Sequence, residues 1–187
     1  MDKQTEEILQ KIEEAEYVLV GLGQEFDMEF FLQSREDYRR IREQLQQQNV
    51  LWLLPYVEEQ FRRQYLPEME AEIEKGLQKL AKVLEKKSYF VVSSSLNHKL
   101  AEVPWKKMLL KKERFVAPCG DWTKKQCPDG CEEGIQTVTE ADEEQLQESF
   151  KKLQTNGFSV PDLGKCPKCG KKLVLNNVYA GRYDEKG

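Results

Sequence analysis

Five cysteines carry most of the chemistry that this sequence offers, and all of them lie between Cys119 and Cys169. Four of them form two close pairs, Cys127-Pro-Asp-Gly-Cys131 and Cys166-Pro-Lys-Cys169-Gly. The second pair has the form of a zinc knuckle, in which a tight turn directs two thiolates at one point. Two such pairs supply the four sulfur ligands of a closed tetrahedral zinc site, with Zn–S distances of about 2.3 Å. Because no position is left open for a substrate, the spacing predicts a structural zinc ion.

Disulfides, inert buried thiols and an iron–sulfur cluster are the alternatives for these cysteines. The first residues, MDKQTEEILQ, are acidic and amphipathic, so they do not have the pattern of a secretory signal or a transit peptide. We therefore expect a cytoplasmic protein, in which disulfides are disfavoured. Cys119 is left over from the two pairs, and taken alone it is interpreted as a partly buried free thiol.

Composition excludes several classes of protein. The chain has 187 residues, of which 39% are hydrophobic and 10% aromatic, enough to build a core, so wholesale disorder is excluded. The net charge of -4 argues against a general nucleic-acid binder, which normally carries a basic surplus. The longest apolar run, residues 50–54, is much shorter than the roughly 20 residues that cross a bilayer. We expect neither a nucleic-acid nor a membrane partner.

Two short apolar runs predict buried strands. Residues 17–20 end in Gly21-Leu22-Gly23, and residues 89–92 end in three serines. Helical patterns separate the two runs, which favours a parallel crossover. The loops after such strands, here 21–25 and 93–98, are where α/β folds bind their ligands. Residues 113–118 are a candidate third strand. Helices are expected over residues 3–14, 35–48, 55–65, 68–87 and 140–154.

The order of these features resembles the sirtuins, which are NAD-dependent protein lysine deacylases. The shared features are a glycine turn after the first strand, a Ser/Asn loop after a later strand, a Cys-Gly, and two cysteine pairs. The resemblance covers most of residues 15–187 and is strongest over 115–131 and 166–175. With Ala-Pro-Cys-Gly before the zinc ribbon, the chain looks most like a divergent bacterial branch of the family.

The resemblance implies NAD or ADP-ribose as a partner. The family's glycine loop wraps the NAD phosphates and falls on residues 21–25, where Gly21 and Gly23 are retained and Glu25 adds a negative charge. The family's Gln-Asn-x-Asp loop aligns with residues 94–97, so that Ser95 and Asn97 replace its asparagine and aspartate. Both can still bond to a ribose or an amide. The family's Pro-Asp-Phe-Arg segment has no recognisable counterpart.

The family's catalytic His-Gly is Cys119-Gly120 in this chain. In sirtuins that histidine is the general base for a ribose hydroxyl, and a thiolate can in principle accept the same proton. Cys119 and Asn97 are therefore the candidate catalytic residues. His98, the only histidine, is interpreted as an incidental polar residue of the loop.

The function implied is a sirtuin-like NAD-dependent deacylase or ADP-ribosyl transferase acting on acyl-lysine protein, with divergent or impaired catalysis. The alternatives are a non-catalytic module that binds NAD or ADP-ribose, and a zinc ribbon that serves protein–protein contacts.

The expected fold is α/β, with a partial Rossmann-like parallel sheet and helices over residues 1–118, including a helical insertion at 35–87. A four-cysteine zinc-ribbon module over 119–178 follows and includes the helix 140–154. Sirtuins continue well beyond this ribbon, so residues 179–187 are expected to begin a missing C-terminal half. The competing view is a complete small protein whose helices over 35–87 cover what would otherwise be exposed.

Overall fold

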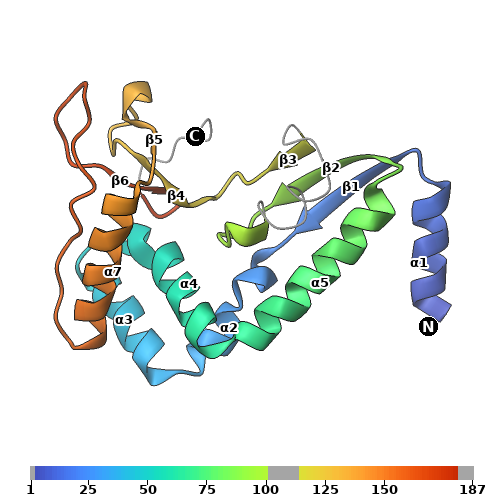
Figure 1. Ribbon diagram of the computed structural model, residues 1–187, viewed down its shortest axis with the longest axis horizontal. Helices are drawn as coiled ribbons and strands as arrows, with labels where there is room; N and C mark the ends of the chain where they lie inside the picture. The colour runs from blue at the N-terminus through green and yellow to red at the C-terminus, as the bar shows by residue number, and fades with distance from the viewer. Residues whose placement is uncertain (1–2, 101–113, 181–187) are drawn as a thin grey trace.

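The computed structural model describes residues 3–100 and 114–180. A parallel sheet lies in its N-terminal part and has the strand order β1-β2-β3 (Figure 1). Its strands are β1 (Tyr17–Leu22), β2 (Ser88–Ser93) and β3 (Phe115–Val116). Tyr17 lies opposite Ser88 and Leu22 opposite Ser93, both in parallel register. The predicted parallel crossover is confirmed, each long strand extends beyond its apolar run, and the fold is α/β.

Helix α5 (Pro67–Leu84) covers one face of this sheet (Figure 1). It begins with proline, whose missing N–H costs nothing in the first helical turn. Leu77, Ala81 and Leu84 are buried against Tyr89 and Val91 of β2. The helix predicted over residues 68–87 is thus confirmed, although it ends three residues before the expected Lys87.

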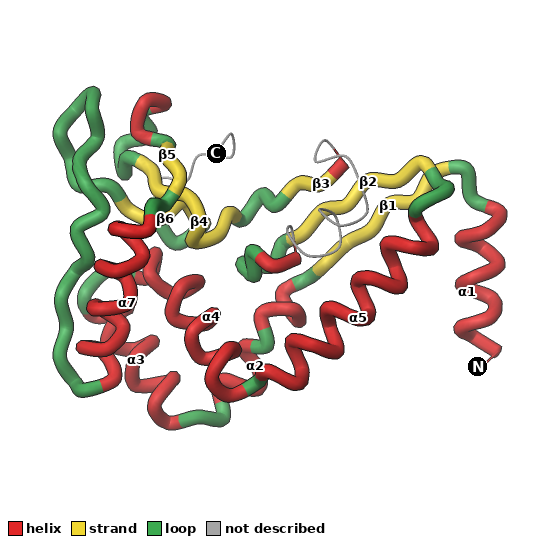
Figure 2. Tube along the Cα trace, in the orientation of Figure 1, coloured by secondary structure: helices red, strands yellow, loops and turns green. Residues whose placement is uncertain are grey.

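Helix α1 (Lys3–Glu14) agrees with its predicted range but has no buried residue. It lies beyond the end of the sheet, apart from α5, in both ribbon and tube views (Figures 1 and 2). The Lys87 ammonium donates hydrogen bonds to the backbone carbonyls of Glu13 and Ala15, at 2.5 and 3.3 Å. These bonds satisfy carbonyls that the helix leaves unpaired at its C-terminal end.

A second sheet, antiparallel with the order β5-β4-β6, lies in the C-terminal part. Its strands are β4 (Gly120–Gln126), β5 (Gln136–Thr137) and β6 (Val174–Asn177). The same part of the chain contains the 3-10 turn η4 (Glu132–Gly134) and the helix α7 (Glu140–Gln154). Helix α7 has the predicted bounds, and Thr139 caps it reciprocally with Asp142.

The segment between β1 and α5 contains three α-helices and two 3-10 turns. It comprises η1 (Gln24–Asp27), α2 (Glu29–Gln33), α3 (Glu36–Gln47), η2 (Leu51–Leu53) and α4 (Leu54–Tyr65). These helices share one core with the second sheet and α7, whose members include Tyr38, Phe61, Trp122, Phe150 and Leu175. The parallel sheet and α5 form a separate, smaller core. No helix among the described residues is long and apolar enough to cross a membrane.

Candidate functional site

The four paired cysteines converge on one point. The Sγ atoms of Cys127, Cys131, Cys166 and Cys169 all lie within 4.8 Å of one another. The Sγ atoms of Cys127 and Cys169 are 3.4 Å apart, and all five cysteines are free thiols. A tetrahedral zinc ion with Zn–S bonds of about 2.3 Å requires sulfur–sulfur separations of about 3.8 Å. The cluster therefore fits a zinc ion after small side-chain adjustments.

Glycines shape the two turns that present these sulfurs. Gly130 and Gly170 adopt positive φ values of 72° and 74°, a conformation that favours glycine. Their N–H groups donate to the carbonyls of Cys127 and Cys166, at 2.9 Å in each turn. Gly134 passes so close that an added Cβ would lie 2.5 Å from the Cβ of Cys127. The turns are thus built for small residues at these points.

The electrostatics of the cluster favour a bound cation. Burial and hydrogen bonds from the other sulfurs raise the pKa of Cys131. Against the effect of burial, the backbone N–H groups of Asp129 and Cys131 lower the pKa of Cys127. Crowded sulfurs therefore oppose the ionisation of all four thiols together, and a divalent cation would remove this opposition.

A second group of polar residues lies at the carboxyl ends of β1 and β2. The Ser95 hydroxyl and the Leu96 N–H both donate to Oδ1 of Asp27, the latter at 2.9 Å. The Asn97 amide donates to the carbonyl of Phe26 at 3.4 Å. The predicted loop residues Ser95 and Asn97 thus contact the 3-10 turn η1, which begins within the glycine loop. A pocket of about 320 Å³ adjoins Asn97, between this loop and α5.

Asp27 is a member of this group that sequence reasoning missed. Its side chain is buried, and burial raises its pKa although Ser95 and the charge of Arg62 oppose the shift. The only signal was an acidic residue shortly after the glycine turn, which in most proteins would be exposed. Through these hydrogen bonds Asp27 connects the loop after β1 to the loop after β2.

Glu25 folds back over the glycine loop. The Gly23 N–H donates to Oε1 of Glu25 at 3.3 Å, and an added Cβ at Gly23 would collide with that carboxylate. Gly21 is exposed, and open space surrounds the place of its Cβ among the described residues. A negative group of the chain itself therefore uses one of the N–H donors that an anion would need.

Cys119 lies just after β3 and is half-buried. Burial raises the pKa of its thiol, and the negative charge of Asp27 raises it further. A thiol with a raised pKa stays protonated near neutral pH, whereas a general base must be able to accept a proton. The environment of Cys119 thus opposes the role for which the resemblance singled it out.

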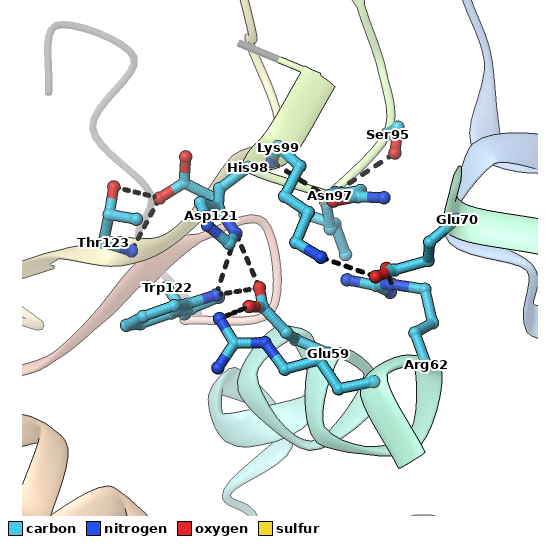
Figure 3. A network of polar contacts seen from close by, with 12 residues as sticks. Glu59, Arg62, Glu70, Ser95, Asn97, His98, Lys99, Asp121, Trp122 and Thr123 are labelled. Atoms are coloured by element: carbon cyan, nitrogen blue, oxygen red, sulfur yellow. Dashed lines mark hydrogen bonds and ion pairs between the residues drawn. The ribbon is translucent and has the colours of Figure 1, made fainter. Parts of the chain in front are cut away.

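The structure corrects the interpretation of His98 as an incidental loop residue. Its side chain is only 8% exposed, and Nδ1 lies 2.6 Å from Oε2 of Glu59 in α4 (Figure 3). The indole N–H of Trp122 in β4 donates to the same oxygen at 2.6 Å. Arg63 pairs with the other carboxylate oxygen. Although burial opposes ionisation, these partners lower the pKa of Glu59 to about 2.

This network joins three parts of the chain. His98 belongs to the loop after β2, Glu59 to α4 and Trp122 to the sheet that carries the cysteines. The His98 and Trp122 rings also meet edge to face, with centroids 5.0 Å apart. The polar edge of the parallel sheet is thereby fixed to the core that contains the cysteine module.

Comparison with known proteins assigns the chain to no family. No family model matches the chain, and no curated protein matches it significantly. What the site can do is therefore argued from its own residues.

Proposed function

We propose that the protein is a sirtuin-like member of the NAD-dependent lysine deacylase family, with a structural zinc ion and impaired catalysis, that binds NAD or ADP-ribose. The observation that carries the proposal is the meeting of the loops after β1 and β2, locked together through Asp27 at the carboxyl edge of a parallel sheet. Ligands of α/β proteins bind at this edge. The parallel order β1-β2-β3 supports the Rossmann-like character of the sheet.

The zinc ion would be held by Cys127, Cys131, Cys166 and Cys169. Four thiolates fill its coordination sphere, so that it supplies folding energy and no chemistry at a substrate. Cys127 and Cys166 belong to the large core, which supports a structural role. Four converging cysteines are also compatible with an iron–sulfur cluster. Measuring the zinc and iron content of the purified protein distinguishes the two sites.

The cofactor would lie over Gly21, Gly23, Ser95 and Asn97. The place of a Cβ at Gly21 is open among the described residues, so there is room at this point for the close approach of a ligand. Ser95 and Asn97 are positioned by hydrogen bonds to η1, so their loop is already ordered for binding.

Impaired turnover follows from Cys119. Burial raises the pKa of its thiol and the negative charge of Asp27 raises it further, which makes the thiol a poorer acceptor for the ribose proton. We therefore favour binding without turnover. Zinc-loaded protein should gain thermal stability with ADP-ribose and should release no nicotinamide from NAD with an acyl-lysine peptide. Release that Cys119→Ala abolishes would contradict impaired catalysis, whereas no response to either nucleotide would favour the zinc-ribbon interaction module.

The substitution Glu25→Gln is expected to strengthen ADP-ribose binding roughly three- to tenfold, at most about 1.4 kcal/mol. The glutamine removes the negative charge that competes with a phosphate for the Gly23 N–H while leaving the length of the side chain unchanged. Affinity is measured by calorimetric titration at low salt. The matched control is Glu16→Gln, which removes the same charge just before β1 begins. Unchanged or weaker binding by Glu25→Gln would show that the carboxylate does not compete.

A further inference from the structure

A pocket of about 360 Å³ lies between α4, α7 and β4, and none of the residues assigned to the cofactor lines it. The two helices pack together, since the rings of Phe61 in α4 and Phe150 in α7 meet with centroids 5.9 Å apart (Figure 1). The residues that line the pocket all belong to the described part of the chain. The packing of these three elements therefore sets the shape of its walls.

Two buried aromatic residues line one part of this pocket. Tyr56 of α4 is 5% exposed and Trp122 of β4 is 6% exposed, and their rings meet edge to face with centroids 5.3 Å apart. The indole N–H of Trp122 is already used, because it donates to Glu59 (Figure 3). The face of an aromatic ring attracts a cation. This wall is therefore suited to a guanidinium or ammonium group.

The hydroxyl of Tyr56 lacks a hydrogen-bond partner among the described residues, although the side chain is almost wholly buried. Buried polar groups are normally paired. Burial and the charge of Glu143 raise the pKa of Tyr56 to about 12, so the hydroxyl stays neutral and its oxygen can accept a hydrogen bond. Because Tyr56 lines the pocket, a ligand that brings an N–H donor would supply the missing partner.

Three glutamates of α7 also line the pocket: Glu140, Glu143 and Glu144. All three are exposed, and none has an ion-pair partner in the part of the chain that the structure describes. The cation of the lining, Arg63, already pairs with Glu59. Acidic residues in a first turn favour the helix dipole, which accounts for Glu140 and Glu143, but Glu144 lies beyond that turn. The pocket thus keeps an unbalanced negative charge.

We propose that this pocket binds an arginine side chain of a protein partner. A guanidinium is planar, so it can stack on an aromatic ring, and its five N–H donors match carboxylate and hydroxyl oxygens. A free polyamine shares the charge but has neither the planar shape nor the fork of donors. Gln60 and Gln147 of the lining can both donate and accept, which suits the peptide groups beside an arginine. These amides favour a peptide over a free cation.

The test is a nuclear magnetic resonance titration of the full, zinc-loaded chain with a capped Gly-Arg-Gly peptide at low salt. The indole N–H signal of Trp122 reports on the pocket. The signal is expected to shift saturably, and the affinity should fall as sodium chloride screens the carboxylates. The same peptide with citrulline, which is neutral, should bind at least roughly tenfold more weakly. Spermidine is the third probe and should bind more weakly than the arginine peptide.

Two variants distinguish a binding role from a structural one. Tyr56→Phe removes the unpaired hydroxyl and keeps the ring, so it should weaken arginine binding roughly three- to tenfold without lowering thermal stability. Glu143→Gln should weaken binding by a similar factor, roughly three- to tenfold. The matched control is Glu148→Gln, which removes the same charge from α7 outside the lining and should leave the affinity unchanged.

No shift with the arginine peptide, or equal binding of the arginine and citrulline peptides, would overturn the proposal. So would equal effects of Glu143→Gln and Glu148→Gln, or unchanged binding by Tyr56→Phe. Spermidine that binds more tightly than the peptide would reject a protein partner and assign the pocket to a free polyamine. None of these measurements contains a nucleotide, so the pocket and the proposed cofactor site can fail independently.

Discussion

Replacing Cys166 and Cys169 together by serine is expected to abolish zinc binding and to unfold the core around the cysteine module. Cys127 and Cys166 pack in the same core as Trp122, Leu146 and Phe150, so the loss should reach beyond the two turns. Structural zinc sites contribute about 10–16 kcal/mol of apparent binding energy in small peptides, which is comparable to the whole stability of a domain, about 5–15 kcal/mol. Metal content by mass spectrometry and thermal unfolding by circular dichroism measure the effect.

The control for this experiment is Cys119→Ser, which changes a half-buried cysteine outside the cluster. It should retain one zinc ion per chain. Chelation of the wild type should reproduce the double variant. Full zinc occupancy in the double variant Cys166→Ser, Cys169→Ser would show that these cysteines are not zinc ligands. Iron instead of zinc in the wild-type protein would show that the four cysteines hold an iron–sulfur cluster.

Glu59→Ala is expected to destabilise the protein by about 1–3 kcal/mol, the usual effect of leaving a buried hydrogen-bonding group without its partner. The alanine removes the carboxylate that His98 and the Trp122 N–H share, leaving the Trp122 N–H only its 3.1 Å contact with Nδ1 of His98, and it leaves Arg63 without its partner. Urea unfolding monitored through tryptophan fluorescence measures the loss. Glu144→Ala, at an exposed position of α7, is the control and should change stability little.

The contribution of Glu59 should also depend on pH. Its pKa is lowered in the folded state to about 2, from an ordinary value of 4.5. The unfolded chain therefore binds the proton more readily, and the stabilisation is present above about pH 4.5 and is lost as the pH falls towards 2. The difference in stability between wild type and Glu59→Gln should shrink over that range. A difference that stays constant would mean that the charge of Glu59 carries no stabilisation.

Local patterns predicted the elements well. The helical pattern of residues 140–154 predicted α7, and the short apolar run closed by glycine predicted β1. The helical patterns between the two apolar runs predicted the parallel pairing of β1 with β2. The two Cys-Pro turns predicted the sulfur cluster, because ligand spacing within a knuckle is a local property. Pro55 does not start its helix, which begins one residue earlier at Leu54, since proline is tolerated in the first turn.

Contacts between distant segments were not predictable in the same way. Glu59 and Asp27 are acidic residues, a type that is usually exposed, and only their distant partners His98 and Ser95 explain their burial. Helices α3 and α4 were assigned to an insertion in the part over residues 1–118, and they share the core of the cysteine module. Periodicity shows which face of a helix is apolar, but it does not say which neighbour covers that face. Helix α1 shows the same limit, because its amphipathic pattern is present although none of its residues is buried in the described part of the chain.

The most direct test of the central claim is a calorimetric titration of folded, zinc-loaded protein with ADP-ribose. Saturable binding at one site per chain is the predicted result, because the locked loops at the carboxyl edge of β1 and β2 already form an ordered surface beside an exposed glycine. NAD should compete for the same site. Absence of binding by protein that retains its zinc and its fold would contradict the account.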